Sequence, residues 1–417
     1  MSSSPSLPQH DPYAVLRVHD FRLLIIGRFL TSFGGEMLTF AVSWELWLRT
    51  QSAFALGLVG LVQVVPVLLL SLPAGHFADQ HNRRRILVVT QLVFTATSLG
   101  LAVLSWTQGP LLLIYACLLV IGIGRAFSDP ASSTLIPETV PPELFSNAAT
   151  WSSSAWQTAA ITGPAVAGLL VAARGSVTEI YIFDALATLT FVILLGMIHG
   201  RRLPLARKAP TLESLKEGLR FMRDTKVILA AITLDMFAVL FGGAVALLPI
   251  YATDILNVGS VGLGVMRAAP SIGALIMAVF IAHRPPFQQA GKTLLFSVAG
   301  FGLATIVFGI SKNFWLSVLM LGTLGALDNI SVVIRSTLML TRVPDEMRGR
   351  VSSVNSIFIS MSNELGAFES GFVASLIGPV LSVVAGGIGT LIVVIVVAAV
   401  WPEMRNLKTL SPRTEEI

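Results

Sequence analysis

The feature that most constrains this chain is a series of apolar stretches, each long enough to cross a lipid bilayer as a helix. A spanning helix needs about 20 mostly apolar residues, and twelve segments meet this requirement. The predicted spans are Leu23–Trp47, Phe54–Phe77, Ile86–Trp106, Leu111–Ser133, Asn147–Ala172, Ile180–Gly200, Ile228–Leu256, Val261–Ala282, Thr293–Ile310, Phe314–Leu340, Val351–Leu376 and Val380–Trp401. Of the 417 residues 54% are hydrophobic and 12% are charged, against about 25% charged in soluble domains. We therefore expect an all-α membrane protein.

The basic residues between the spans predict the orientation of the chain. Twelve crossings place both termini on one side, and Lys and Arg are enriched on the cytoplasmic side of membrane proteins. Twenty-one of these residues fall on the side of the termini, whereas Arg49, Arg174 and Lys312 fall on the other. This asymmetry predicts cytoplasmic termini in a bacterial inner membrane, with anionic lipid at the cytoplasmic face. It also explains the basic charge without a nucleic-acid partner.

An internal repeat predicts two pseudo-symmetric six-helix bundles. At an offset of 203, Ser133-Thr134-Leu135 matches Ser336-Thr337-Leu338, and Gly163 and Gly168 match Gly366 and Gly371. Gly60 and Pro66 match Gly264 and Pro270 at an offset of 204. The predicted organisation is an N-terminal tail (1–20), a first bundle (21–200), a linker (201–226), a second bundle (227–401) and a C-terminal tail (402–417). Leucines at helical spacing in the linker predict an amphipathic helix, either on the membrane surface or solvated.

The loop after the second span resembles the signature of the major facilitator superfamily, G-x-x-x-D-R/K-x-G-R-R/K. Gly75, Asp79, Arg83 and Arg84 fit that pattern, while Gln80 and Asn82 depart from it. The resemblance implies a cytoplasmic gate in which Asp79 caps a helix N-terminus and the arginines help to latch the two halves together. The alternative is an ordinary basic loop.

The fifth span resembles the G-x-x-x-G-P-x-x-G-G motif of antiporters in that superfamily. Gly163, Pro164 and Gly168 match, and Ala159 and Ala167 replace two glycines. Small residues allow close helix approach, so we expect Leu at either glycine to abolish activity and Ala to be mild. Together with Phe21-Arg22 and the Pro344–Arg350 loop, these motifs resemble the enterobactin-exporter-like branch of the drug:proton antiporters.

Ionisable residues inside spans are costly and mark functional candidates. Proton coupling needs a carboxylate whose burial favours the protonated form. The coupling candidates are Glu36, Asp235, Asp328 and Glu364; Glu36 and Asp235 are preferred because no basic residue lies three or four positions away. The candidates for substrate contact or charge pairing are Arg28, Arg125, Arg267 and Arg335. Arg125 and Asp129 are spaced to pair on one helix face.

These features predict a secondary active transporter, a proton-coupled exporter of a small amphipathic molecule such as a siderophore or drug. We expect a monomer. We also expect no cofactor or metal site, because no P-loop and no His/Cys cluster with metal-ligand spacing is present. For the same reasons we expect no enzyme activity. The alternatives are an uptake symporter or facilitator and, in another class, a non-transporting membrane sensor or assembly subunit.

Overall fold

The computed structural model describes residues 11–133, 135–199 and 212–408, and the regular structure within these ranges is helical. The N-terminal half contains η1 (Ala14–Arg17), α1 (His19–Thr50), α2 (Ala53–Gln80), α3 (Arg83–Trp106), α4 (Leu111–Ser133), α5 (Leu135–Thr139), η2 (Pro142–Leu144), α6 (Phe145–Arg174) and α7 (Thr178–Met197). The C-terminal half contains α9 (Lys226–Phe241), η3 (Gly243–Leu247), α10 (Leu248–Ile250), η4 (Tyr251–Ile255), α11 (Gly259–Ala282), α12 (Ala290–Ile310), α13 (Phe314–Arg342), α14 (Asp345–Ile377), α15 (Pro379–Val400) and α16 (Pro402–Arg405). Helix α8 (Leu212–Asp224) connects the halves.

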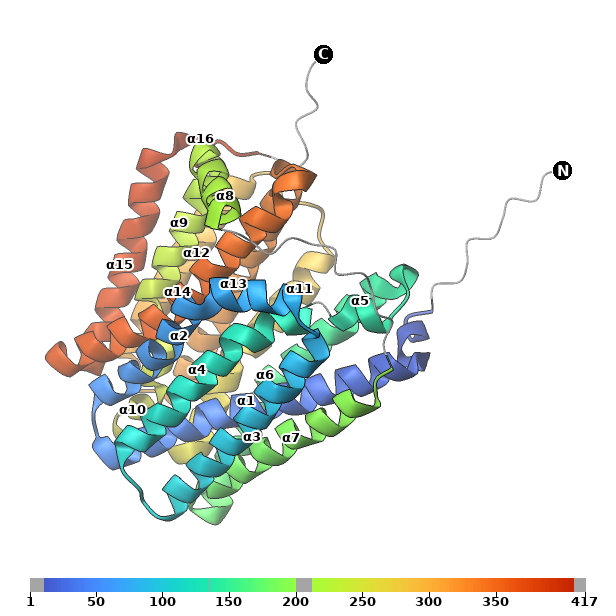
Figure 1. The fold of residues 1–417 in the computed structure, drawn as a ribbon. Helices are drawn as coiled ribbons and strands as arrows, with labels where there is room; N and C mark the ends of the chain where they lie inside the picture. Colours follow the sequence, from blue (N-terminus) through green and yellow to red (C-terminus); the bar gives the residue numbers. More distant parts are fainter. Residues whose placement is uncertain (1–10, 134, 200–211, 409–417) are drawn as a thin grey trace.

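The two halves form bundles with the same internal packing (Figure 1). In the first bundle α1 packs on α6 and α7, α3 packs on α4 and α7, and α2 packs on α4. In the second, α9 packs on α14 and α15, α12 packs on α13 and α15, and α11 packs on α13. Each pair in one list has its counterpart in the other. The two pseudo-symmetric six-helix bundles predicted from the repeat are thus confirmed.

The outer surface of the bundles is apolar, as a membrane requires. Leu69, Trp106, Leu112 and Phe296 are each more than 70% exposed, and eleven helices among the described residues are long and apolar enough to cross a bilayer. The remaining predicted span, the eleventh along the chain, corresponds to α14, which is less apolar than the other eleven. Its polar residues include Asn363 and Glu364, which line a cavity between the halves, so its composition reflects an inward-facing polar side.

The seventh predicted span is interrupted, which the sequence analysis missed. The α-helix α9 ends at Phe241. The rest of the span is formed by the 3-10 helix η3, the short α-helix α10 and the π-helix η4. A side chain at Gly243 would come within 2.2 Å of the Gly366 carbonyl oxygen, and one at Gly366 within 2.8 Å of the Val239 oxygen. This glycine contact brings the irregular turns directly against α14.

Two segments that were predicted to lie outside the bundles, the N-terminal tail and the linker, contain helices that pack on them. Val15 in η1 is fully buried, and the Trp151 indole on α6 donates a hydrogen bond to the Pro12 carbonyl (3.0 Å). Helix α8 packs on α9 and α14, with Met222 1% exposed and Glu217 ion-paired to Arg350 at 2.5 Å. The predicted amphipathic linker helix therefore places its apolar side on the second bundle. The preceding linker residues, 201–211, lie outside the described residues.

Candidate functional site

The two bundles meet along two seams, α2 against α14 and α6 against α11, and glycines allow the close approach. A Cβ at Gly60 would lie 2.5 Å from the Glu364 carbonyl oxygen, and one at Gly264 would lie 2.6 Å from that of Pro164. The facing helices also contribute glycines. A Cβ at Gly371 on α14 would lie 2.5 Å from the Cα of Gly57, and a Cβ at Gly168 on α6 would lie 2.5 Å from the carbonyl oxygen of Ser260. Gly60 and Gly264 are repeat partners, as are Gly168 and Gly371. The seams are therefore one contact used twice.

The contacts that join the halves gather at the end away from the described chain ends. There, the Trp47 indole on α1 donates a hydrogen bond to Thr253 on η4 (2.7 Å), and one apolar cluster spans both halves. Nearer the chain ends, the apolar clusters around Leu24 and around Ala230 each stay within one half. Figure 1 accordingly shows α5 and α8 well apart.

A central cavity of about 540 Å³ lies between the halves. Its walls come from both bundles, and its charged residues are Glu36, Arg125, Arg267, Asp328 and Glu364. Four of them are on α1, α4, α13 and α14, and Arg267 is on α11. Apolar side chains, among them Leu56, Phe301 and Leu324, fill the rest of the lining. A mixed apolar and charged lining of this size is typical of a site for a small molecule.

Two arginines reach across the cavity from one half to the other. Arg267 donates a hydrogen bond to the Ser43 hydroxyl on α1 (2.9 Å), and its buried Nε has no hydrogen-bond partner among the described residues. Arg125 on α4 forms a loose ion pair with Glu364 on α14 at 4.0 Å, whereas Asp129 lies beyond ion-pair distance. The predicted Arg125–Asp129 pair is therefore wrong, because a partner from the other half competes for the guanidinium.

Glu36 lies on α1, on the wall that the first bundle contributes to the central cavity. Among the described contacts its carboxylate has no hydrogen bond and no ion pair within 4.0 Å, and its charge interacts with those of Arg267 and Arg125. Its backbone is held by α6, where a Cβ at Gly163 would lie 2.8 Å from the Glu36 Cβ. At the two repeat offsets of 203 and 204, the counterpart of Glu36 in the second half is Val239 or Leu240, both apolar. The carboxylate is therefore specific to the first half.

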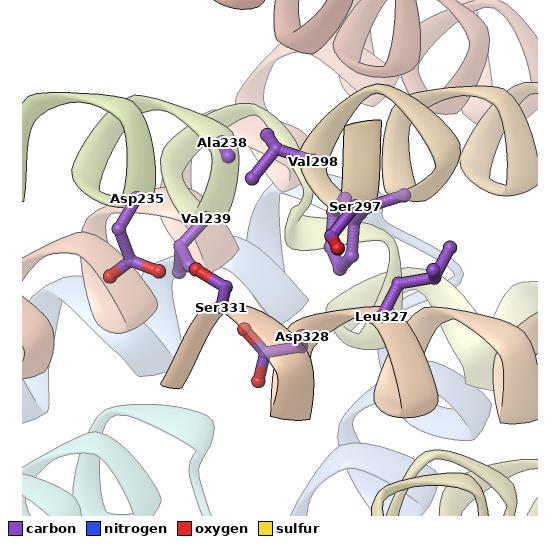
Figure 2. Close-up of a pocket in the computed structure, with 9 residues that line it drawn as sticks. Asp235, Ala238, Val239, Ser297, Val298, Leu327, Asp328 and Ser331 are labelled. Carbon is purple, nitrogen blue, oxygen red and sulfur yellow. The ribbon is translucent and has the colours of Figure 1, made fainter. Parts of the chain in front are cut away.

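Asp235 has a partner that local spacing could not reveal. Arg335 on α13 binds it at 2.6 Å, and both side chains are 8% exposed. Figure 2 shows Asp235 on α9 and Asp328 on α13 on either side of Ser331. Asp235 and Asp328 line two small cavities, of about 10 and 160 Å³, and Asp328 also lines the central cavity. The expectation that Asp235 is buried without a partner is thus wrong, and of the two roles predicted for Arg335 the structure shows the charge pair.

Arg28 lies apart from the central cavity. Its guanidinium donates hydrogen bonds to the hydroxyl (2.5 Å) and carbonyl (3.3 Å) of Ser132 on α4, within the first bundle. These bonds fasten α1 to α4. Of the four predicted arginines, Arg125 and Arg267 line the central cavity. Arg335 lines the cavity of about 160 Å³ beside Asp235, and Arg28 joins two helices.

The predicted gate motif lies where α2 ends and α3 begins. Arg83 pairs with Glu138 on α5 at 3.5 Å, and Arg84 donates to the carbonyls of Ile198 (2.6 Å) and Gly196 (2.5 Å). Burial raises the pKa of the Glu138 carboxyl, and the Arg83 charge opposes that shift. Gly75 is buried in α2, and the side chain of Asp79 lies outside the described part of the structure. The contacts described for Arg83 and Arg84 thus fall within the first half, so the latch stays a prediction.

The antiporter-like motif divides between two interfaces. Gly163 packs on α1 within the first bundle, whereas Gly168 and the carbonyl of Pro164 form the α6–α11 seam, where the Ser260 hydroxyl donates to the Gly168 carbonyl (3.0 Å). The expectation that Ala is mild conflicts with this packing, because an added Cβ at Gly168 meets backbone at 2.5 Å. Backbone cannot rotate aside as a side chain can, so even Ala would strain the seam.

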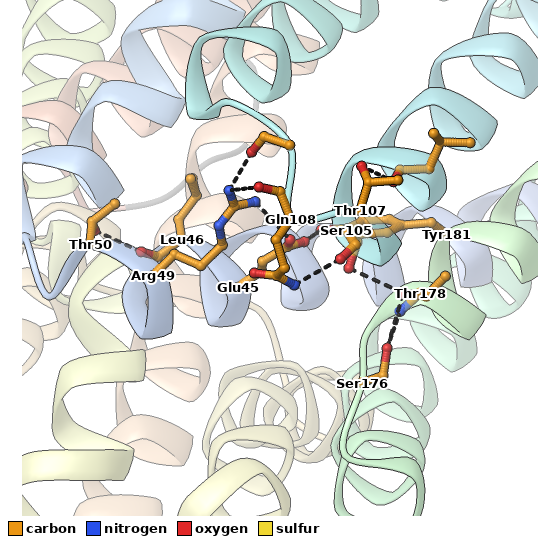
Figure 3. A network of polar contacts seen from close by, with 12 residues as sticks. Glu45, Leu46, Arg49, Thr50, Ser105, Thr107, Gln108, Ser176, Thr178 and Tyr181 are labelled. Carbon is orange, nitrogen blue, oxygen red and sulfur yellow. Dashed lines mark hydrogen bonds and ion pairs between the residues drawn. The ribbon is translucent and has the colours of Figure 1, made fainter.

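Sequence reasoning missed a buried polar network at the closed end of the first bundle (Figure 3). Glu45 is 6% exposed and accepts hydrogen bonds from Arg49 (3.2 Å) and from the Tyr181 hydroxyl (2.8 Å). Arg49 also donates to the carbonyls of Gln108 (3.2 Å) and Gly109. The i, i+4 spacing of Glu45 and Arg49 was the available signal. The network ties α1 and α7 to the loop between α3 and α4.

We expect Tyr181→Phe to destabilise the protein by about 1.5–3 kcal/mol, because it removes a buried hydrogen bond to a charged group. Tyr115→Phe is the matched control, since Tyr115 donates to the neutral carbonyl of Ala55 (2.8 Å) and its loss should cost about 0.5–1.5 kcal/mol. Thermal unfolding in detergent measures both. An equal or smaller loss for Tyr181→Phe would show that Glu45 is not held by this bond.

Two six-helix halves around a charged central cavity, joined at one end by separable helix seams, define the class of membrane transporter that exposes its site to each side in turn. The sequence model of the transmembrane secretion effectors matches residues 10–414. The chain belongs to this family of the major facilitator superfamily and is a multi-pass transporter of small molecules.

The relatives agree with that assignment. The chain is 24% identical over 405 residues to the enterobactin exporter EntS of Escherichia coli K12, with 96% of each chain covered, and equally similar to EntS of Shigella boydii serotype 18. Among solved structures it resembles a bacterial homologue of the lysosomal transporter Spinster, inward-facing and occupied (TM-score 0.74, 13% identity, 95% and 99% coverage). It also resembles a bacterial homologue of the iron transporter ferroportin in an inward-facing state (TM-score 0.70, 17% identity, 94% and 99% coverage). These structures share the fold.

Proposed function

We propose that this protein is a proton-coupled exporter of a small amphipathic molecule of the siderophore or drug type. It acts as a monomer in a bacterial inner membrane, with both termini in the cytoplasm and anionic lipid against its basic loops. The resemblance to an enterobactin exporter over nearly the whole chain supports export and this substrate class. The family and its structural relatives are transporters, which favours transport over catalysis.

One observation carries the proposal: a charged cavity lies between two repeated halves that are joined at one end by glycine seams. With cytoplasmic termini, this state is open toward the cytoplasm and ready to take up substrate from there. Export then requires the seams to part while the halves close at the other end. The contacts that must break include Trp47–Thr253 and Ser260–Gly168, both of which cross between halves.

Glu36 is the favoured proton carrier. A carboxylate that is desolvated without a partner favours its protonated form. Glu36, like Asp328, lines the cavity without a described hydrogen bond or ion pair, and it lies beside two arginines, Arg267 and Arg125. Rearrangement of those arginines between states would change the proton affinity of Glu36. Asp328 and Glu364 also line the cavity and are the alternative carriers, whereas the Asp235 charge is already matched by Arg335.

The test is substrate-dependent proton movement in vesicles that contain the purified chain and a trapped pH dye. A panel of siderophores and amphipathic drugs is added in turn, and empty vesicles are the control. Exchange of protons for at least one compound supports the proposal. Proton and substrate moving in the same direction would identify an uptake symporter instead, and movement of every compound without protons would identify a facilitator.

Asp79→Asn is expected to leave membrane insertion normal and to impair transport, because it removes the charge proposed to latch the cytoplasmic side while keeping the side-chain volume. Cytoplasmic accessibility of a cysteine placed in the cavity should rise. Glu143→Gln, which neutralises an exposed acid in the loop before α6, is the control. Unchanged transport together with unchanged labelling would remove Asp79 from the gate.

A further inference from the structure

A second cavity of about 370 Å³ lies inside the first bundle and joins the central cavity at Glu36, Thr39 and Arg125. We call it the side cavity. The proposed transport cycle uses the Glu36 side of this cavity and assigns no role to the residues that line its interior. Its charged lining comprises Glu36, Asp129, Asp184 and Arg125, and its apolar lining comprises Leu38, Phe94, Ile121 and Trp156. Its volume is within the range of small-molecule sites.

The charges of the side cavity are unbalanced toward the negative. Three carboxylates come from α1, α4 and α7, while the single guanidinium, Arg125, is shared with Glu364 in the central cavity. Asp184 is 4% exposed and accepts a hydrogen bond from Ser98 (2.6 Å). Asp129 has the Ser128 hydroxyl at 3.5 Å. Uncompensated carboxylates at membrane depth are costly, so a positive group in this cavity would be stabilised.

An unpartnered acceptor independently points to a ligand that donates hydrogen bonds. Gln91 on α3 lines the side cavity and is 6% exposed, and within the described ranges its Oε1 has no hydrogen-bond partner. A buried acceptor left without a donor costs about 1–3 kcal/mol. The part of the chain that the structure describes offers it no donor, and an N–H group of a ligand in the cavity would supply one.

Two adjacent glycines of α1 shape this space. A Cβ at Gly34 would lie 2.6 Å from Asp184 Oδ1, so the absent side chain leaves room for that carboxylate beside α1. A Cβ at Gly35 would meet nothing within 4 Å, and Gly35 lines the side cavity. The first glycine thus positions an acid, and the second keeps the cavity open in front of it.

We propose that the side cavity binds an aminoalkyl arm of the transported molecule, with its ammonium group held by Asp129, Asp184 and Gln91. An ammonium group has three N–H donors and no acceptor, which matches two carboxylates and an amide oxygen. The hydrocarbon part of the arm packs on Leu38 and Ile121, and the rings of Phe94 and Trp156 present faces that attract cations. The body of the molecule stays in the central cavity, so this inference rests on the proposed function.

The test is equilibrium binding to the full-length chain in lipid nanodiscs, which needs no gradient. The probe is dansylcadaverine, which carries a primary ammonium on a five-carbon chain. Its N-acetyl derivative keeps the aromatic body and chain but lacks the charge. We expect the amine to bind at least about tenfold more tightly than the acetylated control, as one charge-assisted contact provides.

Three variants locate the effect. Asp184→Asn should reduce the preference for the amine to near one, and Glu179→Gln, which neutralises an exposed acid on the same helix, should keep it. Since a buried acid can affect folding, Gly35→Leu is the second probe of the site: it extends into open space and should block the amine by filling the cavity.

Equal affinity for the two probes, absence of amine binding, or an unchanged preference in Gly35→Leu would overturn the side-cavity proposal. These outcomes are separate from the proposed function. A chain that exchanges protons for substrate but binds both probes equally remains an exporter without an amine subsite. A chain that prefers the amine but moves no protons keeps the subsite and loses the coupling.

Discussion

Glu36→Gln is expected to abolish proton-driven accumulation while substrate binding and downhill exchange persist. Glutamine keeps the size of the side chain and cannot carry a proton, so the substrate gradient would no longer be linked to the pH gradient. One pH unit is worth about 1.4 kcal/mol per proton, enough for about tenfold accumulation by the wild type. The variant should reach a ratio near one, and its rate should lose the pH dependence of the wild type.

Asp235→Asn separates coupling from structure. It leaves Arg335 buried without its partner at 2.6 Å, and breaking a buried ion pair on one side costs about 3–5 kcal/mol. We therefore expect a lower unfolding temperature and less folded protein, with normal coupling in the molecules that fold. Accumulation ratios per folded molecule, with Glu143→Gln as control, distinguish the two effects.

Wild-type uphill transport and pH profile in Glu36→Gln would move the coupling to Asp328 or Glu364.

Gly168→Leu is expected to abolish transport by keeping the α6–α11 seam open. The Cβ alone would lie 2.5 Å from the Ser260 carbonyl oxygen and 3.3 Å from the Gly264 Cα, so the larger side chain cannot be accommodated while the seam is closed. Overpacking costs about 1–3 kcal/mol, which shifts a two-state equilibrium about 5–150-fold. Gly168→Ala should shift the same equilibrium in the same direction by a smaller factor, whereas the sequence analysis expected Ala to be mild.

The shift can be measured by labelling a cysteine at Leu56 in a chain with Cys117 replaced by Ala. Leu56 lines the central cavity and is 4% exposed, so it is protected while the seams are closed. An impermeant thiol reagent applied from the side away from the termini should label Gly168→Leu faster than the parent. Gly196→Leu, where an added Cβ meets nothing within 4 Å, is the control. Equal labelling in both variants and normal transport in Gly168→Leu would exclude the seam from the gate.

The bundles and the repeat could be predicted because the patterns that reveal them, apolar runs and regularly spaced glycines, lie along the sequence itself. Spans are visible as apolar runs, and the matching glycines at offsets of 203 and 204 predicted two equivalent halves. The same glycines proved to form the seams, with Gly168 on Ser260 and Gly60 on Glu364. Which helix each glycine contacts depends on how the halves dock, and that is not encoded in spacing along one helix.

The pairing of buried charges was the part that sequence could not provide. Asp235 and Glu36 look alike when neighbours three and four positions away are considered, yet Asp235 is neutralised by Arg335 from another helix and Glu36 is not. Arg125 likewise finds Glu364 across the halves in place of Asp129 on its own helix. In helical membrane proteins the decisive partners are contributed by neighbouring helices, at distances that only the folded chain defines.

The most direct test of proton-coupled export uses vesicles that contain the wild-type chain and an imposed pH gradient, with the membrane potential clamped at zero. The measurement is the steady-state ratio of substrate inside to outside at a series of gradients. The account predicts that substrate accumulates against the direction of proton flow, that the ratio rises with the gradient, and that an ionophore which collapses the gradient returns it to one. A ratio that stays at one for every gradient, while substrate still crosses through the protein, would contradict the account.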